Sequence, residues 1–534
     1  MNRNSQLFPR ASGVLLHPTC LPGPHGIGDL GAAAYRLVDW LVAAGQSLWQ
    51  VLPLGPTSYG NSPYQTLSAL AGNPLLISLD ELAGAGWLEP GDLASPPASS
   101  SERVDFGAVI PWKMGLLDRA WRRFQAQAAA ADRAAFAAFR RQEEDWLREF
   151  ALFAALKEEH GGRPWTAWPP ALRDRAPEAI AMAAARLDDR IAAHAFRQWL
   201  FARQWSALRE YAASREVRVL GDLPIFVAHD SCDVWARPRL FHLDAEGAPT
   251  VVAGVPPDYF STTGQLWGNP LYDWNAMARE DYAWWVRRLR LALRQTDLVR
   301  IDHFRGFEAY WEVPASAETA VDGRWVKGPG LGFFESLRRH LGVLPIVAED
   351  LGVITEAVEE LRDAFAMPGM KVLQFAWDEP RNPFQPHNHA FNCVVYSGTH
   401  DNDPTNGWWA HECDEPTRDR VRDYVGHPVD EPNWALIRLG MLSVAHTFVM
   451  PMQDVFGLGR EARMNRPGSE SGNWDWRLPG WGLDPAHPAR ERLAHLTWLG
   501  RRRPDQRKSL YEDARERDER ARRAADEAAP RTGD

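Results

Sequence analysis

Hydrophobic residues along this chain fall into short, nearly continuous runs that are separated by polar segments and turn residues. Runs of this kind are typical of strands that are covered on both faces, as in a parallel sheet. Eight of them can be recognised, and they begin near residues 13, 47, 217, 297, 344, 371, 392 and 446.

Segments with helical periodicity lie between several of these runs. They cover residues 30–44, 281–294, 333–340 and 355–365. Alternating strands and helices predict a parallel α/β fold, and eight strands favour a (β/α)8 barrel of the TIM type. A doubly wound sheet is the competing arrangement, and the pattern by itself does not exclude it.

The spacing of the runs predicts one catalytic barrel over residues 1–500 with two large insertions. Residues 54–216 are rich in Ala, Arg and Glu with helical periodicity, so we expect a mainly helical inserted subdomain. Residues 228–277 hold Gly, Pro, Asp and aromatic residues with little periodicity, and we expect a long loop region that binds substrate. Residues 501–534 are dense in charge, which predicts a solvated tail that is disordered or a frayed helix.

The composition narrows the function classes. With 534 residues, 45% of them hydrophobic, the chain is typical of a globular protein. A net charge of −10 argues against nucleic acid or an anionic membrane as the main partner, and no apolar run is long enough to span a bilayer. The four cysteines form no Cys-x-x-Cys pair, and no apolar signal segment is present, so we expect a reduced, cytoplasmic protein.

Three acidic residues, Asp302, Glu349 and Asp401, stand where apolar runs end. The carboxyl ends of barrel strands meet on one face, where barrel enzymes carry out their chemistry. Retaining cleavage of a glycosidic bond needs an ionised carboxylate and a protonated carboxyl about 5 Å apart. Asp302 and Glu349 are predicted to be this pair, and Asp401, beside His400, to stabilise the transition state. A single strand-end Asp is more often a turn, cap or ion-pair residue, so the prediction depends on all three acids together.

The neighbours of the two acids suggest different roles for them. Arg300 lies two residues before Asp302, on the same face of the strand, and its permanent charge favours an ionised Asp302, which suits a nucleophile. Glu349 follows the apolar run 344–348, and desolvation would raise its pKa, which suits a proton donor. Asp350 competes with Glu349, but successive strand residues point to opposite faces, so only one of them can face the site.

A metal or nucleotide cofactor is not expected. Residues 401–412 resemble a calcium loop, but the glycine falls one place late and Pro404 stiffens the turn. His387 and His389, like the pair His411 and Cys413, lack the second cluster that a structural zinc needs. The phosphate-binding and dinucleotide-binding glycine motifs are also absent from the sequence.

Several long strings resemble the amylomaltase or 4-alpha-glucanotransferase family of the alpha-amylase clan. They are RIDHFRG at 300–306, AEDLG at 348–352, GTHDN at 398–402, GNSPYQ at 60–65, GDLPIFV at 221–227, GVPPDYF at 254–260 and GQLWGNP at 264–270. The resemblance runs in order from about residue 13 to residue 499 and implies the same barrel. It also implies that a C-terminal β-sandwich is absent, and the roughly 50 residues between the last run and the charged tail are too few for one.

The resemblance assigns roles to individual residues. It implies Asp302 as the nucleophile, Glu349 as the acid/base and Asp401 as the transition-state stabiliser, with Arg300 and His400 around the cleaved sugar. The residues that match the glucan groove of the family are Tyr59, Asp222, Phe260, Gln265, Trp267, Asp378 and Asn473.

The resemblance further implies that the chain transfers α-1,4-glucan segments by double displacement to the 4-hydroxyl of another glucan or glucose. Its substrates would be α-1,4-glucans and maltooligosaccharides. A hydrolytic amylase or debranching enzyme on the same barrel is the first alternative, and a non-catalytic glucan-binding protein is the second. Trp267, in a glycine-flanked segment, is the predicted gate that excludes water. The sequence does not fix the oligomeric state.

Overall fold

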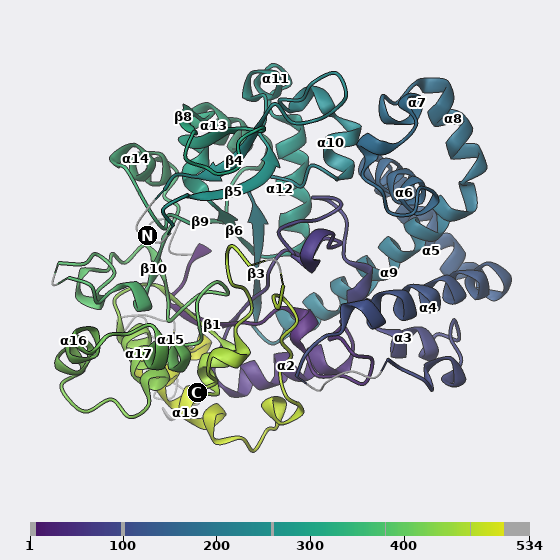
Figure 1. Cartoon of the computed structure of the whole chain (residues 1–534). Coiled ribbons are helices and arrows are strands. Elements are labelled where there is room, and N and C mark those ends of the chain that lie inside the picture. The colour runs from purple at the N-terminus through teal and green to yellow at the C-terminus, as the bar shows by residue number, and fades with distance from the viewer. Residues whose placement is uncertain (1–6, 98–101, 258–260, 380, 470, 507–534) are drawn as a thin grey trace, which may run out of the picture.

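The computed structural model describes residues 7–97, 102–257, 261–379, 381–469 and 471–506 (Figure 1). Eight parallel strands form its central sheet, in the hydrogen-bonded order β10-β11-β12-β1-β2-β3-β6-β9. They are β1 (Ala11–Leu15), β2 (Leu48–Gln50), β3 (Arg218–Pro224), β6 (Leu298–Asp302), β9 (Ile346–Ala348), β10 (Gly369–Val372), β11 (Cys393–Tyr396) and β12 (Thr447–Pro451). All eight apolar runs of the sequence are therefore strands of one sheet.

The sheet is nearly closed. The strands β9 and β10 stand at the two ends of the hydrogen-bonded order, and the backbone N–H of Ala348 donates to the carbonyl of Pro368 at 2.9 Å between them. Around the sheet the strands follow chain order without the reversal that a doubly wound sheet shows. The predicted TIM-type barrel is confirmed, and the strands read as apolar runs because helices cover their outer faces.

The four predicted helices between strands are present. They are α2 (Ala32–Ala43), α12 (Ala283–Gln295), α13 (Gly330–Leu341) and α14 (Glu356–Ala364). The helices that follow β11 are α15 (Thr405–His411), α16 (Glu415–Val425), α17 (Pro432–Leu442), α18 (Met452–Val455) and α19 (Pro488–Leu499).

The segment 54–216 is mainly helical, and Figure 1 shows α4 to α8 gathered at one side of the barrel. The long helix α9 connects this group with the barrel, because one part of it packs on each. Phe196 of α9 lies 4.7 Å, centroid to centroid, from Phe124, while Trp205 lies 6.1 Å from Trp49 of β2. The helices are α3 (Leu79–Gly84), α4 (Phe106–Gln127), α5 (Ala130–Gln142), α6 (Glu144–Glu159), α7 (Pro170–Arg173), α8 (Pro177–Arg186) and α9 (Asp188–Ser214).

The segment 228–277 contains regular structure, so the expectation of a loop without elements was wrong. It holds the helices α10 (Cys232–Ala236) and α11 (Trp274–Arg279) and the strands β4 (Val251–Val255) and β5 (Gln265–Pro270). With β7 (Ala309–Pro314) and β8 (Arg324–Lys327) these strands form an antiparallel sheet of order β5-β4-β7-β8.

The hydrophobic pattern of the sequence does not predict β4 and β5, because both strands are short and partly exposed and therefore contain no long apolar run. Gly254 near the end of β4 and Gly264 just before β5 allow these two strands to approach each other closely. A Cβ at Gly254 would lie 2.6 Å from the carbonyl oxygen of Gln265, and Gly264 has a φ of +68°.

The first residues of the predicted tail are part of the fold. Arg502 is fully buried, and its guanidinium donates to the carbonyls of Ala11, Gly440, Met441 and His446 beneath the barrel. The sequence predicted this arginine to be solvated because it lies in a charged segment. Its hydrogen-bond partners are backbone carbonyls, which the pattern of side chains does not indicate. The rest of the predicted tail, 507–534, lies outside the described residues. Within the described ranges, none of the helices is long and apolar enough to cross a membrane.

Candidate active site

A cleft of about 570 Å³ opens at the carboxyl ends of the barrel strands. Residues of β3 and β6 and of the segments that follow β2, β3, β6, β9, β10, β11 and β12 line it, together with residues of the antiparallel sheet. Nine of the twelve predicted site residues border this cleft, and they are Tyr59, Gln265, Trp267, Arg300, Asp302, Glu349, His400, Asp401 and Asn473.

Arg300 connects two carboxylates at the base of the cleft. Its Nη2 lies 2.8 Å from Oδ1 of Asp302, and its Nη1 donates to both carboxylate oxygens of Asp222 at 2.8 Å. The strand register explains this contact, since Asp222 of β3 stands opposite Arg300 of β6. The Arg300 side chain is 5% exposed, so the guanidinium acts in a setting that screens charge weakly.

Glu349 lies beside Asp302 because β6 and β9 run in register up to the pair Ile301 and Ala348. Two backbone N–H groups hold its carboxylate: that of His303 donates to Oε2 at 2.6 Å, and that of Leu351 donates to Oε1 at 2.9 Å. The carboxyl group is therefore fixed in orientation by the two loops around it.

Burial raises the pKa of Glu349 to about 7, and the negative charge of Asp302 acts in the same direction. The cation Arg300 and the N–H groups of Leu351 and His303 oppose this shift. Near neutral pH, Glu349 can therefore exist in both its acid and its base form.

His303, whose backbone N–H donates to Glu349, has an uncommon backbone conformation. This residue has a φ of +53°, in the left-handed region that non-glycine residues seldom adopt. Its ring meets the ring of Trp267 edge-on at 4.8 Å. Burial lowers the pKa of His303 to about 4, so the ring is neutral at pH 7.

Asp350, the competitor of Glu349, points away from the cleft. It accepts hydrogen bonds from the backbone N–H of Met370 at 2.6 Å and from Arg362 at 2.5 Å. A Cβ at Gly369 would lie 2.3 Å from its Oδ2, so the next strand is shaped around this carboxylate. Asp350 supports the barrel wall, and only Glu349 faces the site, as strand alternation requires.

Asp401 is held by two side chains from separate segments. Nδ2 of Asn465 donates to its Oδ1 at 2.6 Å, and Nε2 of His400 lies 3.4 Å from the same atom. The His400 ring stacks on Tyr64 at 5.1 Å with an interplanar angle of 15°, and the Tyr64 hydroxyl donates to Oδ2 of Asp222 at 2.8 Å. A chain of contacts, made of hydrogen bonds and one ring stack, thus connects Asp401 with Asp222, the partner of Arg300.

Two arginines form ion pairs with Asp403, whose carboxylate would have to bind the metal in a calcium loop at 401–412. Nε of Arg460 lies 2.6 Å from Oδ2 of Asp403, and Nη1 of Arg463 lies 2.7 Å from Oδ1. Arg463 also lies 3.5 Å from Glu412, the last position of such a loop. Among the described residues, no cluster of three or more His, Cys, Asp and Glu side chains has a metal-binding arrangement.

Of the three remaining predicted residues, the structure describes two, and these two do not border the cleft. Asp222 is buried behind it, and burial raises its pKa although Arg300 opposes the effect. Asp378 is exposed and accepts from Nδ2 of Asn382 and the N–H of Glu379. Phe260 lies outside the described residues.

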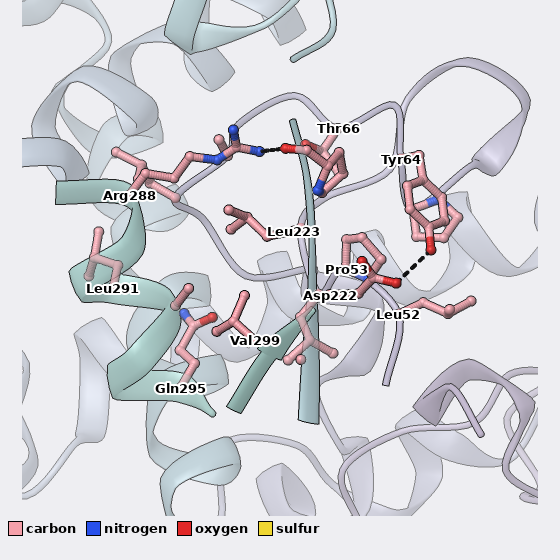
Figure 2. A pocket seen from close by; sticks show the side chains of 18 of the residues that line it. Leu52, Pro53, Tyr64, Thr66, Asp222, Leu223, Arg288, Leu291, Gln295 and Val299 are labelled. Atoms are coloured by element: carbon pink, nitrogen blue, oxygen red, sulfur yellow. Dashed lines mark hydrogen bonds between the residues drawn. The ribbon is translucent and has the colours of Figure 1, made fainter. Parts of the chain in front are cut away.

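Asp222 lines a second, smaller cavity, which has a volume of about 70 Å³. Figure 2 shows this cavity between the ends of β2 and β3 and helix α12, with the Asp222 and Tyr64 side chains at one border. On another border, Arg288 donates to the carbonyl of Pro224 at 2.6 Å. Asp222 therefore faces an internal cavity and Arg300 rather than the open cleft.

The residues that border the cleft but were not predicted as site residues include His303, Tyr64, Asn465 and Trp474. His303 follows Asp302 directly, and Tyr64 lies inside the GNSPYQ string, so both carried a signal. Asn465 and Trp474 carried none, because they come from a segment about 60 residues beyond Asp401 that only the fold brings back.

A (β/α)8 barrel that joins two neighbouring carboxylates, a third acid and a buried arginine in one cleft defines an enzyme of glycosidic-bond chemistry. Comparisons with known proteins identify the family. The chain matches the 4-alpha-glucanotransferase family over residues 16–483. It is 54% identical to the 4-alpha-glucanotransferase of Thermus thermophilus, over 91% of this chain and 98% of that protein. It is 51% identical to that of Synechocystis, over 88% and 94%.

Solved structures agree with this assignment. The amylomaltase from Streptococcus agalactiae in complex with acarbose has a TM-score of 0.89 and 38% identity, over 92% of this chain and 99% of that chain. The amylomaltase from Corynebacterium glutamicum, at 17% identity and a TM-score of 0.77, shows the shared fold alone. The chain belongs to the 4-alpha-glucanotransferase family. Its predicted class, a glucan-transferring enzyme rather than an amylase, is confirmed.

Proposed function

We propose that the chain moves α-1,4-glucan segments by double displacement, with Asp302 as nucleophile, Glu349 as acid/base and Asp401 as stabiliser. The observation that carries this proposal is the unequal setting of the two neighbouring acids. Asp302 is paired with the buried Arg300 cation at 2.8 Å, whereas burial raises the pKa of Glu349 to about 7. One acid is suited to attack and the other to donate a proton.

In the first step an oxygen of Asp302 bonds to the anomeric carbon while the glycosidic bond breaks. Glu349 gives its proton to the departing glycosidic oxygen, which leaves as the 4-hydroxyl of the released chain. The products are a covalent glucosyl ester on Asp302 and an ionised Glu349.

In the second step the ionised Glu349 takes the proton from the 4-hydroxyl of an acceptor glucan. The acceptor oxygen bonds to the anomeric carbon, and the carboxylate of Asp302 departs. The N–H groups of His303 and Leu351 stabilise the ionised form of Glu349 during this interval. A pKa near pH 7 serves both steps, because the same group must donate and then accept.

Asp401 is suited to stabilise the positively charged sugar of the transition state. Asn465 and His400 fix its Oδ1, which leaves Oδ2 available for the substrate. We assign Tyr59, Gln265, Trp267, Arg300, His400 and Asn473 to glucan binding, since all of them border the cleft.

The other three predicted groove residues, Asp222, Asp378 and Phe260, are not assigned to direct glucan binding. The position of Asp222 supports a role through Arg300 rather than through contact with sugar. Asp378 and Phe260 stay predictions from the resemblance.

The acceptor must be sugar rather than water for transfer to dominate. Trp267 supports such a selection, because its ring packs on His303 and its indole N–H donates to Gln265 at 3.1 Å over the cleft. We assign the gate that excludes water to this side chain. The acarbose named for the Streptococcus agalactiae complex supports an oligosaccharide of several sugars as the ligand of this cleft.

Incubation of the pure protein with maltotriose tests the proposal. We expect a ladder of longer maltooligosaccharides together with glucose. Products that are all shorter than maltotriose would contradict transfer. Asp302→Asn should abolish the ladder, and Asp423→Asn, an exposed residue of α16, should keep it.

We also propose the reducing cytoplasm as the compartment. All four cysteines are buried and unpaired, and burial raises the pKa of the Cys20 and Cys393 thiols to about 12, so they resist oxidation. Fractionation of cells that produce the protein tests this, and recovery in a secreted fraction would contradict it.

A further inference from the structure

Trp325 is an aromatic side chain that is exposed at the border of the cleft. It lies on β8 of the antiparallel sheet and is 41% exposed. It borders the same cleft as Asp302 and Glu349. Neither the spacing of the sequence nor the resemblance assigns a role to it.

The Trp325 ring is held rigidly by two neighbours. The guanidinium carbon of Arg305 lies 3.8 Å from the ring centroid, and the ring of Trp311 meets it edge-on at 5.2 Å and 70°. Arg305 is itself anchored, because its Nη1 donates to the carbonyl of Val353. An aromatic surface fixed in this way loses little conformational freedom when a ligand stacks on it.

The same contacts place Trp325 on the Glu349 side of the cleft. Val353 belongs to the loop that starts at Glu349, and Leu351, Gly352 and Val353 of this loop border the cleft. Arg305 therefore joins the Trp325 ring to the loop of the proton donor. A proton donor acts on the oxygen that leaves, so this flank faces the departing chain and later the acceptor.

We propose that Trp325 forms a stacking position for a glucose residue of the departing and acceptor chains, beyond the sugar that receives the bond. The inference depends on the proposed function, and in particular on Glu349 as the acid/base. A flat indole offers apolar area to the C–H face of a glucose ring while polar neighbours bind its hydroxyls. An acceptor of several glucose units reaches this ring, whereas free glucose does not.

Acceptor competition tests this position. With amylose as donor, initial transfer rates are measured against glucose and against maltotriose as acceptors, and the ratio of the two kcat/KM values is compared. We expect Trp325→Ala to lower the preference for maltotriose over glucose about tenfold, through the KM for maltotriose. Trp325→Phe should restore most of the preference.

The matched control is Trp481→Ala. Trp481 is similarly exposed, at 45%, and is not one of the described residues that border the cleft. Its acceptor preference should equal that of the wild type. A Trp325→Ala enzyme whose rates with both acceptors fall equally, or whose preference stays within twofold of the wild type, would overturn the proposal. Failure of the proposed function is distinct, since Glu349→Gln would then keep the wild-type rate of transfer, whatever the acceptor preference of Trp325→Ala.

Discussion

Nη2 of Arg300 lies 2.8 Å from Oδ1 of Asp302, and the same guanidinium holds both oxygens of Asp222. A buried cation bound to two acids fixes the orientation of the carboxylate that we propose as the nucleophile. We expect Arg300→Lys to lower kcat/KM with maltotriose by about 100-fold, because an ammonium cannot bridge two carboxylates in this geometry. Steady-state kinetics measure the loss. Arg422→Lys, which alters a surface pair on α16, should keep the wild-type rate.

The raised pKa of Glu349 predicts a pH dependence of activity. The first step needs its protonated form, so kcat/KM should fall as pH rises through about 7. In Glu349→Gln the rate should fall by about 1000-fold or more with natural donors, and that titration should vanish from the pH profile. A variant that kept both its rate and the alkaline fall would assign the proton donor elsewhere.

The same group predicts a pH dependence of stability. A carboxyl whose pKa is higher in the folded state stabilises the fold at low pH, and this contribution is lost as pH rises from 4.5 through about 7. The free energy of unfolding of the wild type, relative to Glu349→Gln, should therefore fall by up to about 3 kcal/mol between pH 4.5 and pH 8. Urea unfolding at several pH values measures it. A difference that grows with pH would show that Glu349 is ionised more readily in the folded protein.

Asn465 is expected to position Asp401 through its 2.6 Å hydrogen bond. Asn465→Ala should lower kcat about tenfold to 100-fold with a smaller change in KM, because a transition-state contact is weakened. Asn392→Ala, just before β11 at the opposite end of the barrel, is the control. A loss confined to KM would mean that Asn465 binds sugar instead.

The arginines around Asp403 predict that activity survives a metal chelator. Both oxygens of this carboxylate already accept from Arg460 and Arg463, so it has no free position for calcium. Transfer rates with and without excess chelator should agree. A loss of rate that calcium restores would reinstate the loop at 401–412 as a metal site.

Much of the barrel follows from the sequence because strands covered on both faces must be apolar throughout. The acids follow as well, since strand ends are fixed once the strands are known. Contacts between distant segments do not follow from such patterns: Asn465 reaches Asp401, and Arg502 reaches the carbonyls beneath the barrel. The strand β5 was missed because its partly exposed residues give no apolar run. Asp222 was expected in the groove, but its pairing with Arg300 depends on strand register.

The central claim is that Asp302 carries the glucosyl group between donor and acceptor. Glu349→Gln incubated with maltotriosyl fluoride tests it directly, because fluoride leaves without a proton while the second step lacks its base. The mass of the protein should rise by one maltotriosyl group, and peptide mapping should place the added group on Asp302. A label on another carboxylate, or release of fluoride with no labelled protein, would contradict the account.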